Sequence, residues 1–264
     1  AYDSDYLHKS LSDSKFDDVS IYDCTSQWGV FSIAGPKSRN FLKKLVVSED
    51  PDKTMSNKQF PWLSYRDIEI GMCPVRALRV AYTGELGWEL HHPIEMQNYL
   101  LDILLSSGKE FNLKLVGARA QNWLRQEKSY KAFGSDLGRD AGPFESNLSR
   151  FVDINKNFLG KDALLKRKTD VSCVTLLIDG PKDIDPWGRE ALYNETEEVM
   201  LGRLTSAGYS VHFKRSIGIG YVKSSFSEVG TKLRIKIDDA FWDAEIVRDS
   251  PYDPQNERII DRVQ

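Results

Sequence analysis

One short stretch gathers two carboxylates, two aromatic side chains and two glycines, since residues 80–90 read VAYTGELGWEL. Thr-Gly and Leu-Gly break two apolar runs, which predicts a strand that enters a glycine-rich turn and a second strand that leaves it. Gly84 and Gly87 carry no side chain that would keep a flat ligand from the backbone. Because side chains alternate along a strand, Trp88 and Glu89 should point to opposite faces, one packing and the other facing a cavity. The pattern suits a planar heterocycle; a two-strand corner with solvated charges is the alternative.

A second segment offers permanently charged donors. Residues 117–130 have helical composition and are followed by the stop signal Gly134, and Arg119 and Arg125 lie within them. A guanidinium is a planar fork that holds a carboxylate through two hydrogen bonds. The alternative for either arginine is a solvated side chain, or one paired with Glu127. The polar loop 135–145 follows directly, and loops held by a rigid scaffold often carry binding groups.

Charge and hydropathy exclude several classes of protein. The 264 residues contain 36 basic and 39 acidic side chains, a net charge of −3, which argues against a nucleic-acid partner. No apolar run approaches the roughly 20 residues of a membrane helix, and the beginning of the chain does not resemble a signal peptide. We expect a location in the cytoplasm or, in a eukaryote, in the mitochondrial matrix.

The cysteines and histidines do not have metal-ligand spacing. Cys24, Cys73 and Cys173 are far apart, an odd number without a CxxC pattern, which argues against both disulfides and a zinc site. His91 and His92 are neighbours in a predicted strand and should face opposite sides. The sequence therefore predicts no metal.

The first two thirds of the chain mix strands and helices. Helices are predicted around residues 6–11, 35–45, 94–105, 117–130 and from 158 onward, and strands at 19–23, 29–33, 68–72 and 75–80. This mixture predicts an α+β layer over residues 1–168. In residues 169–264 strand-like segments at 171–178, 198–204, 217–222 and 232–247 alternate with turns, which predicts a small all-β barrel or jelly-roll domain.

The motifs occur in the order found in one family. Tyr82–Glu89 resembles the signature of the glycine-cleavage T-protein family, the folate-dependent aminomethyltransferases. Further matches follow it downstream: GARA at 117–120, LRQEK at 124–128, FLGK at 158–161, TSAG at 205–208 and IGIGYV at 217–222. AGPKSR at 34–39 and YDPQN at 252–256 look most like the folate domain of dimethylglycine and sarcosine dehydrogenases.

The resemblance implies a fold, a cofactor and site residues. The fold would be a partial aminomethyltransferase folate-binding domain followed by the barrel, and the ligands tetrahydrofolate and an amine donor. A carboxylate accepts both members of the paired N–H donors of a pterin ring at once, and Glu89 occupies the matching position. Tyr82 would form a wall or donate a hydrogen bond, Phe133 would stack on the ring, and Arg125 would contact the cofactor. Trp88 is counted with these cofactor-binding residues.

The resemblance also implies what must come from elsewhere. Family members carry an upstream segment with an aspartate assigned to the chemistry, and Asp23 does not match it, so the catalytic residue is not identified in this chain. We expect a fragment of a longer enzyme, or a chain that needs an N-terminal half or a flavin domain as partner; FAD would belong only to that domain. Alternatives are a noncatalytic folate-binding or assembly module and a folate-dependent demethylase.

Overall fold

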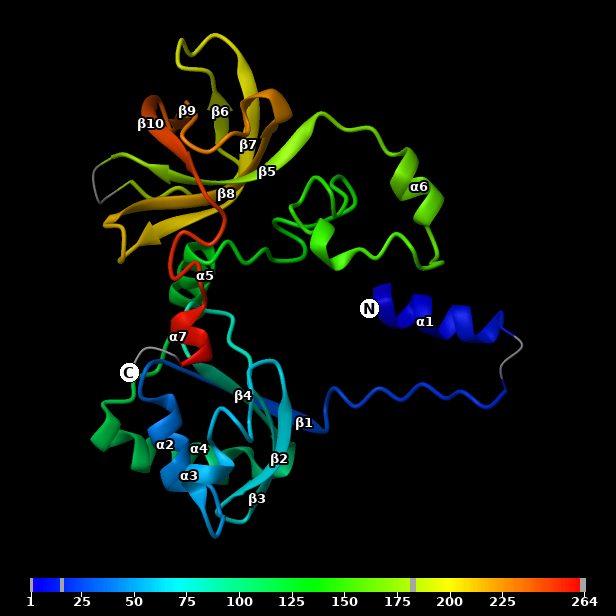
Figure 1. Cartoon of the computed structure of the whole chain (residues 1–264), viewed down its shortest axis with the longest axis vertical. Coiled ribbons are helices and arrows are strands. Elements are labelled where there is room, and N and C mark those ends of the chain that lie inside the picture. The colour runs from blue at the N-terminus through cyan, green and yellow to red at the C-terminus, as the bar shows by residue number, and fades with distance from the viewer. Residues whose placement is uncertain (1, 15–16, 181–183, 262–264) are drawn as a thin grey trace. The chain divides into compact units, whose positions relative to one another are not determined.

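Two compact units, each formed by several stretches of the chain, make up the computed structural model, which describes residues 2–14, 17–180 and 184–261. The first unit comprises Ala1–Ile33, Lys37–Val80 and Trp88–Leu113, and the second Ala34–Pro36, Ala81–Gly87 and Lys114–Gln264. Figure 1 shows both. The predicted domains, residues 1–168 and 169–264, are continuous ranges, whereas each compact unit combines separate stretches of the chain. The domain division therefore stays a prediction.

A four-stranded sheet in the order β1-β4-β3-β2 is the centre of the first unit. Its strands are β1 (Trp28–Ala34), β2 (Tyr65–Ile70), β3 (Cys73–Leu78) and β4 (Gly87–Pro93), and its helices are α1 (Tyr2–Ser12), α2 (Ser38–Leu45), α3 (Pro51–Thr54) and α4 (Gln97–Gly108), with 3-10 turns at Ile94–Met96 and Lys109–Phe111. β2 and β3 pair as an antiparallel hairpin around Gly71. Within α1 no residue is buried.

Within the described part of this unit, the side chains on one face of the sheet are buried and those on the other face are more exposed. Along β3, Cys73, Val75 and Ala77 are buried, whereas Pro74 and Arg76 between them are exposed. Helices α2 and α4 supply buried apolar side chains to the covered face: Phe41, Leu42, Leu100 and Leu104. Strand alternation therefore turns every second residue of the sheet toward its open face.

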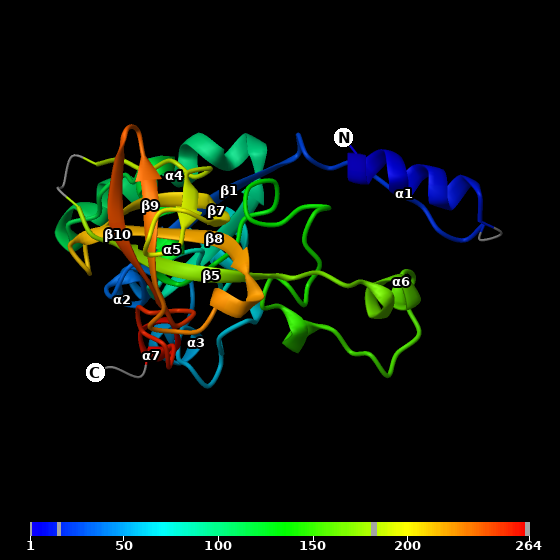
Figure 2. The same cartoon turned by 90° about the horizontal axis from the view of Figure 1, so that it is seen from above.

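The second unit is dominated by a closed barrel in the order β10-β5-β8-β7-β6-β9. Its strands are β5 (Val171–Ile178), β6 (Ala191–Tyr193), β7 (Met200–Ser210), β8 (Arg215–Lys223), β9 (Lys232–Ile237) and β10 (Ala240–Val247), and the 3-10 turn Ser224–Phe226 follows β8. All six strands of the ring are antiparallel to their neighbours. β6 is labelled in Figure 1, and β5, β7, β8, β9 and β10 are also labelled in Figure 2. Leucine, isoleucine and valine side chains fill the interior, so the predicted barrel is confirmed.

Helix α5 (Ala118–Glu127) lies against the barrel at β7 and β8. The contact is close because Gly208 of β7 has no side chain: a Cβ there would lie 2.0 Å from Cδ1 of Trp123. A long connection with the 3-10 turn Ser149–Phe151 and α6 (Lys161–Lys166) leads from α5 to β5, and α7 (Glu257–Ile260) follows the barrel. The indole of Trp123 thereby fixes the helix that carries Arg125.

Most predicted elements are present, with one clear exception. Residues 19–23, predicted as a strand, form none. Their alternating pattern lacks a partner strand within the described residues, and Val19 and Tyr22 are 50% and 82% exposed. Among the described residues no helix has the length and apolar character needed to cross a membrane.

The packing of α5 on Gly208 gives a stability prediction. Gly208→Ala forces a methyl group into the Trp123 ring, and we expect a loss of about 1–3 kcal/mol in the free energy of unfolding. Urea denaturation measures it. The control is Gly138→Ala, where a Cβ would meet nothing within 4 Å, and where a change within about 0.5 kcal/mol is expected. Equal losses in both variants would contradict this view of the contact.

Candidate functional site

The signature stretch runs from one compact unit into the other. Tyr82–Gly87 belongs to the second unit, together with Arg125 and Phe133, whereas Trp88 and Glu89 belong to the first. Tyr82 and Arg125 therefore share a unit, whereas Glu89 belongs with its neighbours in the sheet.

Trp88 is a packing residue of the first unit. It is fully buried, and the Phe60 ring meets it edge-on with the two ring centroids 6.2 Å apart. The guanidinium groups of Arg39 and Arg79 lie 5.4 and 5.7 Å from the indole centroid, a cation–π arrangement. Contact between this side chain and a ligand stays a prediction; the structure shows Trp88 anchoring β4 in the core.

Glu89 points to the open face of the same strand, as the alternation predicted. It pairs in register with Leu78 of β3, and its side chain is 35% exposed. A carboxylate oxygen lies 3.2 Å from Nε2 of His91, the next residue on that face. The carboxylate is held by a neighbour on one side and retains acceptor positions toward solvent, the arrangement needed to accept paired donors from a flat ring.

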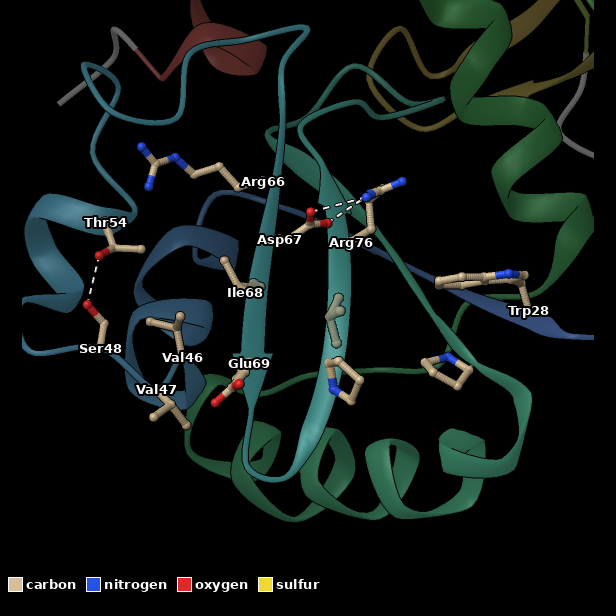
Figure 3. Close-up of a pocket in the computed structure, with 13 residues that line it drawn as sticks. Trp28, Val46, Val47, Ser48, Thr54, Arg66, Asp67, Ile68, Glu69 and Arg76 are labelled. Carbon is tan, nitrogen blue, oxygen red and sulfur yellow. Dashed lines mark hydrogen bonds and ion pairs between the residues drawn. The ribbon is translucent and has the colours of Figure 1, made fainter.

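A groove of about 500 Å³ lies over another part of the same unit. Figure 3 shows the exposed indole of Trp28, the carboxylate of Glu69 and the Asp67–Arg76 ion pair, with two hydrogen bonds of 2.8 and 3.1 Å. None of the predicted site residues lines this groove. The groove is a concave surface of this unit, and Glu89 does not line it.

Tyr82 lies in an aromatic environment in the second unit. Its ring stacks on Tyr130, with centroids 6.1 Å apart and planes inclined by 22°, and its hydroxyl donates to the Lys131 carbonyl at 3.2 Å. Burial raises the pKa of Tyr82, an effect that nearby Arg125 opposes and Asp136 reinforces. The structure thus brings Tyr82 and Arg125 into one neighbourhood, and Tyr82 remains 36% exposed.

Arg125 has its guanidinium inside the protein, where only 2% of the residue is exposed. Nη1 donates to the Asp136 carboxylate and to the Tyr130 carbonyl, both at 2.7 Å, and Nη2 donates to Ser206 Oγ at 2.7 Å. Nε donates to Asn122 at 2.8 Å. Direct contact with a cofactor stays a prediction, and the fork seen here is engaged by protein groups.

Asp136 is the residue that sequence reasoning missed. It belongs to the polar loop already noted, but Glu127 was the partner considered for the helix arginines. In the structure Asp136 accepts from Thr205 at 2.6 Å and from Ser206 at 2.7 Å, besides Arg125. The Ala132 N–H also donates to this carboxylate at 2.9 Å, so Asp136 closes its own loop as well.

Phe133 and Glu127 have different environments. Phe133, in the loop closed by Asp136, is 83% exposed, so its ring is open to a ligand. Glu127 is 4% exposed and accepts hydrogen bonds from Ser210 and from the His212 amide. Its carboxylate fixes the end of α5 to the end of β7.

A cysteine and a tyrosine share the buried side of this region. The Tyr221 hydroxyl donates to the Asp136 carbonyl at 2.8 Å and lies 2.8 Å from Ser146 Oγ. Burial raises the pKa of Tyr221 to about 12 and that of Cys173 to about 12. Cys173 is therefore a neutral thiol at physiological pH. Within the described residues no cluster of three or more His, Cys, Asp or Glu side chains could hold a metal ion.

Thiol reactivity tests this environment. The thiolate is the reactive form, and burial raises the pKa of Cys73 as well as that of Cys173, whereas Cys24 is exposed. We expect iodoacetamide at pH 8 to label Cys24 while Cys73 and Cys173 react only after unfolding. Mass spectrometry of peptides from a time course distinguishes the three. Early labelling of Cys173 in the folded protein would contradict its burial.

The ion pair of Arg125 and Asp136 gives a second stability prediction. Asp136→Asn keeps the shape but leaves a buried guanidinium without a counter-charge, and we expect a loss of about 3–5 kcal/mol in urea unfolding. Asp67→Asn is the matched control, because Asp67 also pairs with an arginine but both side chains are more than half exposed. Its effect should stay below about 1 kcal/mol. A small loss for Asp136→Asn would refute the structural importance of the pair.

Comparison with protein families places both parts of the chain. Residues 1–156 match the model of the GCVT N-terminal domain, and residues 172–253 match that of the glycine cleavage T-protein C-terminal barrel domain. The second range contains the observed barrel strands except Val171, the first residue of β5.

Individual proteins similar to this chain carry names from the same family. Mitochondrial dimethylglycine dehydrogenase of Mus musculus is 36% identical over 88% of this chain, which covers 26% of that protein. An aminomethyltransferase of Caldanaerobacter subterraneus is 29% identical over 83% of the chain and 57% of that protein. The crystal structure of aminomethyltransferase T from Bartonella henselae shares the fold, with a TM-score of 0.72 at 20% identity over 88% of this chain and 61% of that one. The chain thus spans about a quarter of the length of the dehydrogenase.

Proposed function

Because the chain belongs to the glycine cleavage T-protein family, we propose that it is the tetrahydrofolate-binding portion of a one-carbon-transferring enzyme. The enzyme would take a methylene group from an N-methylated amine such as dimethylglycine or sarcosine, or from an aminomethyl donor, and form methylenetetrahydrofolate. The relatives named dimethylglycine dehydrogenase and aminomethyltransferase support this class of reaction. One observation carries the assignment to a site: the half-exposed carboxylate of Glu89 on the open sheet face.

Glu89 would hold the pterin ring. A pterin presents a ring N–H beside an exocyclic amine, and one carboxylate accepts both donors. Trp88, buried on the opposite side of β4, fixes the strand so that the carboxylate does not have to be ordered when ligand binds. His91 at 3.2 Å limits the rotation of the Glu89 side chain. Binding and orientation are therefore the contributions of this strand.

In the second unit, Tyr82 and Phe133 would contribute apolar surface. Tyr82 is held by Tyr130 and Lys131 and keeps an exposed part, and the Phe133 ring is largely exposed. Aromatic faces of this kind stack on flat rings. Arg125 fits a supporting role, since its hydrogen bonds go to Asp136, Tyr130, Ser206 and Asn122. Tetrahydrofolate supplies the nucleophilic nitrogens, and the transfer depends mostly on orientation.

Other parts of the reaction would lie outside these residues. Oxidation of an N-methyl amine needs a two-electron oxidant, and in the proposal this is FAD in a separate domain or subunit that acts with this chain. The proposed compartment is the cytoplasm or the mitochondrial matrix. A noncatalytic folate-binding or assembly module is the second candidate, and a folate-dependent demethylase the third; transfer assays with amine and sulfonium donors, with the partner domain supplied, distinguish them.

Calorimetric titration with tetrahydrofolate under anaerobic conditions tests the site. Glu89→Gln replaces one acceptor oxygen by a donor that faces the donors of the pterin, and we expect the dissociation constant to rise about ten- to hundredfold. An unchanged dissociation constant would refute the role of Glu89.

The matched control is Glu69→Gln. Glu69 lies on the open face of the same sheet, in β2, and lines the groove of Figure 3. The Glu69→Gln substitution should leave the affinity for tetrahydrofolate unchanged. If Glu69→Gln weakens binding and Glu89→Gln does not, folate occupies the groove instead.

A further inference from the structure

The segment that follows the barrel packs on the glycine-rich turn of the signature, and both belong to the second unit. We propose that Tyr252 is a positioning residue, which holds the turn Tyr82–Gly87 in the geometry that binds folate. The proposal rests on the proposed function, because it assigns to Tyr252 an effect on folate affinity through that turn. We call residues 250–260 the C-terminal strap.

The Tyr252 ring occupies the space left by a missing side chain. A Cβ at Gly84 would lie 2.5 Å from Cδ1 and 2.6 Å from Cε1 of Tyr252, so the ring rests directly on the backbone of the turn. The Tyr252 hydroxyl donates to the carboxylate of Glu85, the next residue, at 2.5 Å. The turn is thus held at two successive residues by one side chain.

Neighbouring groups fix the Tyr252 ring itself. The His212 ring meets it edge-on, with the two ring centroids 4.7 Å apart. Arg258, in helix α7 of the strap, places its guanidinium 5.3 Å from the centroid of the Tyr252 ring. Arg258 also reaches Glu85 at 3.4 Å. The Tyr252 amide donates to the Glu127 carbonyl at 3.0 Å, which ties the strap to the end of α5.

A buried lysine anchors the rest of the strap. Lys128 is 2% exposed, and its Nζ donates to the Asp253 carbonyl and to Asn256 Oδ1, both at 2.7 Å. Its Cδ would lie 3.2 Å from a Cβ at Gly84, so the lysine and Tyr252 pack together on that glycine. Burial lowers the pKa of Lys128, and nearby Asp253 opposes the shift. A buried ammonium with specific acceptors holds the strap in a single position.

The strap backbone is bent into an uncommon shape. Ser250, Asp253 and Asn256 have φ values of 54°, 46° and 59°, in the left-handed region that non-glycine residues rarely adopt. Asp253 offsets part of this cost by accepting from the Glu257 and Arg258 amides at 2.9 and 3.1 Å. Such conformations persist where the surroundings over-determine them.

The strap restricts the backbone conformations that the turn Tyr82–Gly87 can adopt before a ligand binds. Gly84 and Gly87 give the segment many accessible conformations, and ordering such a segment upon ligand binding would cost free energy. The strap orders it beforehand, and preorganisation of this kind increases affinity without a ligand contact. Tyr82, two residues before Gly84, is on the part of the turn whose position the strap sets.

The test is Tyr252→Phe, which keeps the ring on Gly84 and removes the hydrogen bond to Glu85. We expect the dissociation constant for tetrahydrofolate, measured by calorimetry on the full chain, to rise about tenfold. Glu85→Gln is the conservative rescue, because its amide oxygen still accepts from Tyr252, and it should affect affinity less than Glu85→Ala. Tyr193→Phe, a tyrosine that packs on Phe241 of the barrel, is the matched control and should leave affinity unchanged.

A second measurement does not depend on folate. Hydrogen exchange of the amides in residues 83–87 should be faster in Tyr252→Phe than in the unchanged chain, while exchange of the barrel strands stays the same. Uniformly faster exchange would indicate a general loss of stability and overturn the proposal. Loss of binding in Glu89→Gln with no change in Tyr252→Phe would also overturn it and leave the proposed function intact. If the unchanged chain binds no folate, the proposed function fails, and the exchange result alone decides whether Tyr252 holds the turn.

Discussion

The second unit depends on a buried ion pair whose charges leave water only because each guanidinium nitrogen of Arg125 donates to a protein acceptor. Arg125 from α5 and Asp136 from the following loop are satisfied by each other and by Thr205 and Ser206 of β7. An unpaired buried charge is far more costly than a lost surface contact, so helix, loop and barrel have to keep one arrangement. The exposed Phe133 ring is presented by the loop that this network closes. The ion pair therefore helps to hold the loop that exposes Phe133.

The first unit holds one carboxylate, that of Glu89, at a fixed position on its surface. β4 does so through strand alternation, with Trp88 buried in the core and Glu89 turned outward beside His91. The indole with its two flanking guanidinium groups resists sliding of the strand, since a register slip by one residue would bury the carboxylate and expose the tryptophan. Burial of one side chain thus determines the direction of its neighbour.

Glycine at position 84 connects local flexibility with long-range packing. A residue without a side chain makes the turn deformable, and the same absence lets the Tyr252 ring and the Lys128 chain approach the backbone closely. Close packing thus offsets the flexibility of the turn, because the C-terminal strap, through Tyr252, restricts the backbone that Gly84 leaves free to move. The turn belongs to the signature of the family, and the packing of Tyr252 and Lys128 on Gly84 holds its backbone in place.

The sequence alone determined the pattern-based features. Strand alternation set the opposite directions of Trp88 and Glu89, and helical periodicity and turn residues placed α5 and the strands of the barrel, because these signals act over a few residues. Residues 19–23 alternate in the same way and form no strand, since a strand also needs a partner. Only the tertiary structure decided that Arg125 pairs with Asp136 and not with Glu127, and that Tyr252 rests on Gly84. Those contacts join residues far apart in the chain, and their energy depends on burial and on the number of satisfied hydrogen bonds, which no local pattern encodes.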